Sequence, residues 1–187
     1  RNIVPIIMGL AILLLLMPRP LSAQLDIGVS MSTTYSDNVF QLSEYDITRW
    51  DHSHPNLEYA NTTDDLNLGV RFDLAYPLRY QWWKFIPSVT ATVSQNIFNP
   101  NKQRQDALFR LRVERYYWNF TALYGYYPEN YVRSYVDTDG TQHLEPYSYA
   151  RNLYRGDLNL KPFKKTTLQF HGRYEQYYYN QFFTEFD

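Results

Sequence analysis

The sequence predicts an all-β protein, an antiparallel up-and-down transmembrane β-barrel of which about seven strands are visible. Three observations predict it: segments that alternate apolar and polar residues, a regular order of long and short connections, and aromatic residues near the strand ends. The alternation is clearest in LNLGVRFDLAY, where every second residue from Leu66 to Tyr76 is apolar, with Arg71 and Asp73 between them. Successive side chains of a strand point to opposite faces, so this segment has one apolar and one polar face.

Composition excludes several classes of protein. The chain of 187 residues carries a net charge of −1, and the interspersed charges give no support to nucleic-acid binding. It has no cysteine, which excludes disulfides and thiolate metal sites. The mean hydropathy of −0.52 excludes a bundle of membrane-spanning helices but not a membrane barrel, because half of each barrel strand is polar.

The first element is a continuously apolar segment, which we expect to be a signal peptide over residues 1–23. Its run Ile6–Leu16 has the length of a signal-peptide core and is short for a membrane span. Small residues before Gln24 suit a cleavage site, so the barrel domain is predicted over 24–187. The alternative is a buried N-terminal helix.

Seven strands follow in the mature chain, and most have about ten or more residues, the length that a tilted strand needs to cross a bilayer. Strands of soluble proteins average about five or six residues. The predicted ranges are 24–35, 66–76, 85–97, 105–115, 118–127, 151–161 and 166–179. In the same order, their apolar faces are marked by Ile27 and Val29, Leu66 and Phe72, Val89 and Val93, Phe109 and Leu111, Trp118 and Tyr124, Tyr154 and Leu158, and Leu168 and Phe170.

The polar positions of these strands hold charges of both signs, often two residues apart. In a soluble β-sandwich, the alternative fold, this face would meet bulk water. Neighbouring opposite charges instead suit a confined, hydrated wall, so we predict that they face a barrel lumen. The predicted lumen-facing residues are Arg71, Asp73, Arg110, Arg112, Glu114, Arg155, Asp157, Lys161, His171, Arg173 and Glu175.

The connections between the predicted strands alternate in length. The two long ones, 36–63 and 128–150, fall on the same side of the sheet, which is extracellular if the first strand runs outward. Membrane barrels have short periplasmic turns and longer outer loops. Aromatic residues gather at the periplasmic turns and are predicted to form an interfacial girdle. They are Tyr76, Tyr80, Trp82, Trp83, Tyr116, Tyr117, Trp118 and Phe163.

The stretch TTYSDNVFQLSEYDI at 33–47 resembles the Y-x-D-N-V/I-F opening of large bacterial outer-membrane β-barrel families, porin-like and associated with exopolysaccharide export. The matching residues are Tyr35, Asp37, Asn38, Val39 and Phe40. An alternative reading of Asp37-Asn38 is a tight turn. The resemblance implies the outer membrane of a Gram-negative bacterium as location. It also implies outer-membrane lipid, the barrel-assembly machinery, and small solutes or polysaccharide as partners.

Seven strands are an odd number, whereas bacterial single-chain barrels have an even number. The chain begins with Arg1 and ends with Asp187, not with a terminal aromatic residue, so we expect a fragment.

No arrangement of residues predicts catalysis, a metal or a cofactor. His52 and His54 have no evident third ligand, and Asp137 and Asp139 fit a hairpin turn better than a calcium loop. No G-x-S-x-G motif accompanies His171. The sequence therefore predicts a non-enzymatic, porin-like channel for passive solute passage or polysaccharide export. The alternative is a structural or adhesive barrel whose outer loops bind surface partners.

Overall fold

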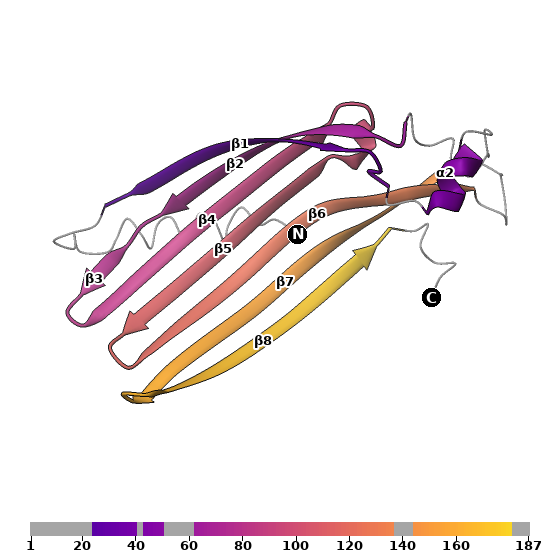
Figure 1. Ribbon diagram of the computed structural model, residues 1–187. Coiled ribbons are helices and arrows are strands. Elements are labelled where there is room, and N and C mark those ends of the chain that lie inside the picture. Colours follow the sequence, from indigo (N-terminus) through magenta and orange to yellow (C-terminus); the bar gives the residue numbers. More distant parts are fainter. Residues whose placement is uncertain (1–23, 41–42, 51–61, 137–143, 181–187) are drawn as a thin grey trace.

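The computed structural model describes residues 24–40, 43–50, 62–136 and 144–180, which form one antiparallel sheet with two short helical segments in its connections (Figure 1). The predicted signal peptide at 1–23 lies outside these residues. The elements are β1 (Asp26–Ser36), α2 (Glu44–Trp50), β2 (Asp65–Ala75), β3 (Leu78–Tyr80), β4 (Trp83–Asn96), η2 (Pro100–Lys102), β5 (Arg104–Arg115), β6 (Trp118–Val136), β7 (Leu144–Phe163) and β8 (Thr166–Tyr179).

The strands follow one another through the sheet in chain order, β1-β2-β4-β5-β6-β7-β8, while the short β3 pairs only with β4. Every pairing is antiparallel. The all-β, up-and-down arrangement is therefore confirmed. Among the described strands β1 and β8 are not paired with each other, so this sheet is open.

Two predicted connections are corrected by the structure. The expected long loop 128–150 is largely strand, because β6 continues to Val136 and β7 begins at Leu144. Pairing resumes after irregularities between Tyr127 and Asn130. Pro128 lacks a backbone N–H, which interrupts the ladder locally, and the Tyr- and Val-containing segment beyond it still favours a strand. The expected connection 77–84 contains β3, which turns back into β4 through Gln81, whose φ is 51°.

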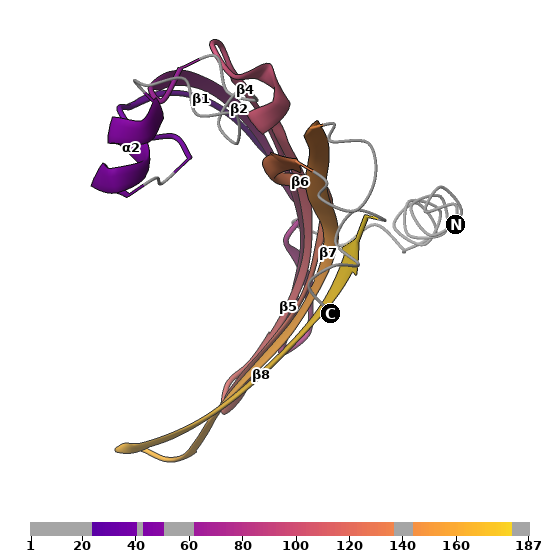
Figure 2. The ribbon, with the colours of Figure 1, turned by 90° about the vertical axis from the view of Figure 1, so that its right-hand side faces the viewer.

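The sheet is bent into a trough rather than flat (Figure 2). Its register places apolar residues of neighbouring strands opposite one another on one side, whereas the other side combines charged and polar residues with Ile86, Leu108, Leu123 and Leu153. Val29 pairs with Phe72, Val70 with Val93, and so on along one surface, which we call the apolar face. The residues between them form the opposite surface, the charged face.

Most large hydrophobic side chains lie on the surface of the sheet rather than in a core. Among the described residues only Leu78, Tyr127 and Tyr147 are buried hydrophobics. On the apolar face, by contrast, Met31 is 82% exposed and Phe170 is 55% exposed. The sheet therefore has no protein core of its own on that face.

Candidate functional site

The charged face collects every residue that the sequence predicts to face a lumen. Direct cross-strand partners show this: Arg71 pairs with Thr92, Arg112 with Thr121, and Asp157 with His171. Alternation along each strand then places the remaining members on the same side. That this face lines a lumen stays a prediction.

One short motif recurs on the charged face: an arginine followed two residues later by a carboxylate. Two residues of spacing bring both side chains to the same face of a strand, about 6–7 Å apart, within reach of the long arginine side chain. Among the described residues, five such ion pairs form within single strands. They are Arg71–Asp73 at 2.8 Å, Arg104–Asp106 at 3.1 Å, Arg112–Glu114 at 2.7 Å, Arg155–Asp157 at 2.9 Å, and Arg173–Glu175, whose Nε lies 3.0 Å from the carboxylate.

The pair Arg104–Asp106 was absent from the predicted set, although its R-Q-D spacing is the signal that identifies the others. The predicted fourth strand began at residue 105, one position too late to include the arginine. In the structure β5 begins at Arg104, and Asp106 is buried.

Ion pairs between strands link the motifs into a network. Lys84 on β4 lies 3.3 Å from Glu114 on β5, and His171 on β8 lies 2.7 Å from Asp157 on β7. Glu114 and Asp157 thus each contact one partner on their own strand and one partner on the neighbouring strand. Such networks keep both signs of charge satisfied on a crowded polar surface.

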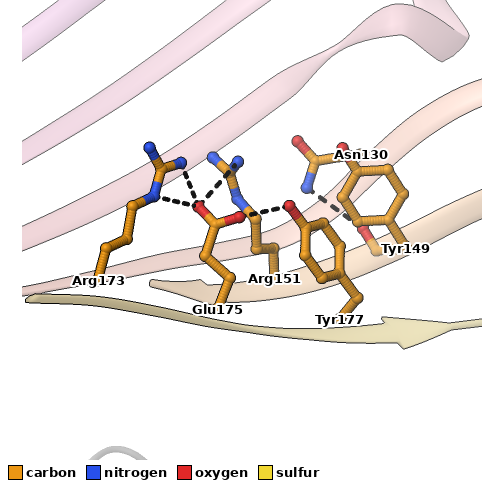
Figure 3. Close-up of polar contacts among 6 residues, drawn as sticks. All are labelled: Asn130, Tyr149, Arg151, Arg173, Glu175 and Tyr177. Atoms are coloured by element: carbon orange, nitrogen blue, oxygen red, sulfur yellow. Dashed lines mark hydrogen bonds and ion pairs between the residues drawn. The ribbon is translucent and has the colours of Figure 1, made fainter. Parts of the chain in front are cut away.

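Glu175 is the most connected carboxylate in this network (Figure 3). It accepts hydrogen bonds from Arg173 on β8 and from the Tyr177 hydroxyl, the latter at 2.5 Å. Across the strand pair, Arg151 on β7 lies 3.8 Å away. Farther along, the Asn130 amide donates to the Tyr149 carbonyl at 3.2 Å and joins β6 to β7. Strands β6 to β8 are therefore joined by side chains as well as by the ladder.

Tyr127 is a buried aromatic residue on the charged face, and it contacts two guanidinium groups. The carbon Cζ of Arg151 lies 4.0 Å from its ring centroid, and that of Arg104 lies 5.7 Å away. Cation–π contacts of this kind stabilise by about 0.5–2 kcal/mol. Sequence reasoning missed this cluster, because it depends on the register that brings β5, β6 and β7 together.

Side chains are exposed on both faces of the sheet, and on the charged face His171 and Arg173 are 58% and 64% exposed. The carboxylate side chains of Asp157 and Glu175 are 16% and 18% exposed, whereas the Tyr174 residue beside them on the apolar face is 60% exposed.

The predicted aromatic girdle lies at the end of the sheet that holds the β3–β4, β5–β6 and β7–β8 turns. Trp83 and Trp118 make an edge-to-face contact at 5.5 Å between ring centroids, and Arg115 lies 5.0 Å from the Trp83 ring. Most of the other aromatic side chains are open, and Tyr116 is 84% exposed. The rings thus form an exposed band at this end of the sheet, and its position at a membrane interface stays a prediction.

At the opposite end of the sheet, one buried carboxylate joins the start of β2 to the connection between β4 and β5. Asp65, at the start of β2, is 1% exposed and accepts three hydrogen bonds at the turn into η2. The Phe98 and Asn99 backbone N–H groups lie 3.0 and 2.9 Å from it, and the Asn99 side-chain amide lies 2.8 Å away. No local pattern in the sequence indicates this contact, because its partners are more than thirty residues apart.

Asp64, in the connection before β2, has hydroxyl partners. The Thr62 hydroxyl donates to its carboxylate, and the Tyr35 hydroxyl donates to it at 3.1 Å. These hydrogen bonds, that from Thr62 foremost, hold the pKa of the Asp64 carboxyl below its ordinary value.

The weaker chemical candidates do not form a site among the described residues. His52, His54, His143, Asp137 and Asp139 lie outside these residues. Within the described ranges no three His, Cys, Asp or Glu side chains come together as metal ligands would. In the same part of the chain, none of the helices has the length and apolar character needed to cross a membrane.

Comparison with known proteins identifies no relative: no protein-family model, curated protein or solved structure matches this chain.

Proposed function

We propose that this protein is an outer-membrane β-barrel whose charged face lines a water-filled pore for passive passage of solutes. The observation that carries the proposal is the apolar face of the sheet, whose large side chains are exposed rather than packed in a core. Acyl chains suit a continuous surface with exposed side chains such as Met31 and Phe170. An aromatic band at the turns fits the boundary between lipid and water.

The charged face suits a pore wall rather than a protein core. Its arginines and carboxylates satisfy one another at 2.7–3.1 Å yet keep contact with solvent, as the 54% exposed Arg71 side chain shows. Water can therefore fill the space beside them. The arrangement of charges around such a wall would bias which solutes pass.

Closure of the sheet is part of the proposal. The open edges of β1 and β8 carry backbone N–H and C=O groups, and in hydrocarbon each unpaired group costs several kcal/mol. A barrel satisfies them all, whether the missing pairing comes from further strands or from another copy of the sheet. The strand lengths suit a membrane, since β4 has 14 residues and β8 has 14.

Planar-bilayer recording tests the pore. The full-length protein, folded in detergent and added to the bilayer, should give ohmic conductance steps, and Arg110→Glu should shift the reversal potential toward cation selectivity. Folded protein that gives no conductance would refute the pore and leave the barrel standing. Protein from residue 24 onward that stays monomeric and folded in detergent-free buffer would refute the membrane environment itself.

A second candidate is a structural or adhesive barrel whose lumen is closed by the ion pairs. The extension of β6 and β7 to Val136 and Leu144 favours it, because this hairpin carries the sheet onward at the end opposite the aromatic band. Tyr149 packs there against Tyr177 and Tyr179, with ring centroids 5.4 and 5.9 Å apart. Limited proteolysis of intact cells that abolishes attachment but not permeability would support this candidate over the pore.

A further inference from the structure

The charged face contains a hollow of about 470 Å³ over β1, β2, β4 and β5. Its lining on this face includes the small residues Gly28, Ala75, Ser88 and Thr90 beside the larger Ile86. Small residues from three adjacent strands leave room that large side chains fill elsewhere on this face. The volume is ample for a solute of about ten non-hydrogen atoms.

The charged groups at the rim of the hollow are of two kinds. Asp73 and Arg112 are paired: Asp73 with Arg71 and with the Thr90 hydroxyl at 2.6 Å, and Arg112 with Glu114.

The other two rim charges are Arg110 and Asp26. Among the residues that the structure describes, neither side chain forms an ion pair or a hydrogen bond. They differ in this from the arginine–carboxylate pairs beside them. The hollow thus has one guanidinium and one carboxylate without a hydrogen-bonded partner among the described residues, and the Arg110 charge acts at longer range on Asp73.

The register places these two charges at opposite ends of one row. Asp26 pairs with Ala75, Ala75 pairs with Ser88, and Ser88 pairs with Arg110. Three strand spacings separate the backbones of Asp26 and Arg110 by about 14 Å. On this row only a methyl group and a hydroxymethyl group lie between them, while Asp73 on the adjacent row interacts with the Arg110 charge and is itself paired with Arg71.

We propose that this hollow binds small zwitterionic solutes, with the solute's carboxylate at Arg110 and its ammonium group at Asp26. A guanidinium offers parallel N–H donors that match a carboxylate, and a carboxylate accepts from an ammonium group. A solute with only one charge would leave one of the two groups without a hydrogen-bonded partner. The inference deepens the proposed function, because solutes reach this face through the pore.

Equilibrium binding to the folded protein in detergent micelles tests the site without requiring conduction. The probe is 6-aminohexanoate, whose two charges are separated by a flexible chain, and ligand-observed NMR titration measures its dissociation constant. Hexanoate and hexylamine are the single-charge comparisons. The zwitterion should bind at least about fivefold more tightly than either, the change expected for one additional ion pair of ~1 kcal/mol.

Two variants at separate ends of the row identify the site. Arg110→Gln and Asp26→Asn should each weaken 6-aminohexanoate binding about fivefold, down to the level of a singly charged probe. Lys161→Gln is the matched control, since it removes a positive charge from the same face outside the hollow and should leave binding unchanged. Far-ultraviolet circular dichroism checks that each variant is folded.

Equal binding of the zwitterion and of hexanoate would overturn the inference, as would unchanged binding in both rim variants or no binding to the wild-type protein. A conducting protein with any of these results keeps the pore and loses the site. A protein that binds 6-aminohexanoate as described but conducts no current loses the pore and keeps the site.

Discussion

The buried Asp65 carboxylate provides the sharpest test of how this sheet is held together. Asp65→Ala removes the acceptor of three hydrogen bonds and leaves the Phe98 and Asn99 backbone N–H groups without that partner. The lost hydrogen bonds are those that hold the connection between β4 and β5 against the start of β2. We expect this one substitution to loosen the end of the sheet opposite the aromatic band.

The expected magnitude follows from the burial and number of these bonds. A hydrogen bond to a charged group contributes about 1.5–3 kcal/mol, and an unsatisfied buried donor costs about 1–3 kcal/mol. The three bonds share one carboxylate and are not additive, and water can reach a turn more easily than a core. Asp65→Ala should therefore lower the free energy of unfolding by about 3–5 kcal/mol.

Asp65→Asn should have a smaller effect, about 1.5–3 kcal/mol. Its amide keeps one oxygen acceptor, but its NH₂ group faces donors in place of the second oxygen. Asp26→Ala is the matched control, because this exposed aspartate makes no side-chain hydrogen bond among the described residues. It should change the free energy of unfolding by less than about 0.5 kcal/mol.

Urea unfolding of the protein in detergent micelles, followed by tryptophan fluorescence, measures these differences. Stability changes appear as shifts of the midpoint at constant slope. If Asp65→Ala unfolds within about 0.5 kcal/mol of the wild type, the carboxylate does not fasten the turn and the reasoning fails. The same conclusion follows if Asp26→Ala is as destabilising as Asp65→Ala.

Three further predictions use other parts of the sheet. Gly125→Ala should lower the free energy of unfolding by about 1–3 kcal/mol in the same urea assay, because the added Cβ would lie within 3.3 Å of three side chains. Gly172→Ala is the control: its added Cβ would meet no atom within 4 Å, so it should change the free energy of unfolding by under about 0.5 kcal/mol. Equal effects of the two substitutions would contradict this prediction. Asp157→Asn should cost about 1–2 kcal/mol, because it weakens contacts with an arginine and with His171 2.7 Å away; a neutral result would show that the network contributes nothing. Folding lowers the pKa of Asp64, so the stability that this carboxylate contributes is present above the ordinary aspartate value near pH 4 and is lost as the pH falls through the folded value. Asp64→Asn should therefore lose less stability in acid than the wild type. An unchanged dependence of stability on pH would refute this prediction.

The sequence alone identified seven of the strands and the faces of their alternating residues, but not β3 or the outer parts of β6 and β7. Alternation with a period of two is a local property, so Arg71 and Asp73 could be assigned to one face without knowledge of any partner strand. The paired spacing of Arg155 and Asp157 is local in the same way. The aromatic band was predictable because Trp83 and Tyr116 lie beside turns that the chain itself marks.

Only the tertiary structure decided the contacts between segments distant in the chain. The pairing of β6 with β7 continues past Pro128 because a long partner strand stabilises it, which a window of sequence cannot show. Asp65 meets Asn99 across 34 positions, and Asp26 shares a row with Arg110 through two intervening strands. The register of strand pairing determines these contacts, because a slip of one residue between two strands would move every side chain to the opposite face.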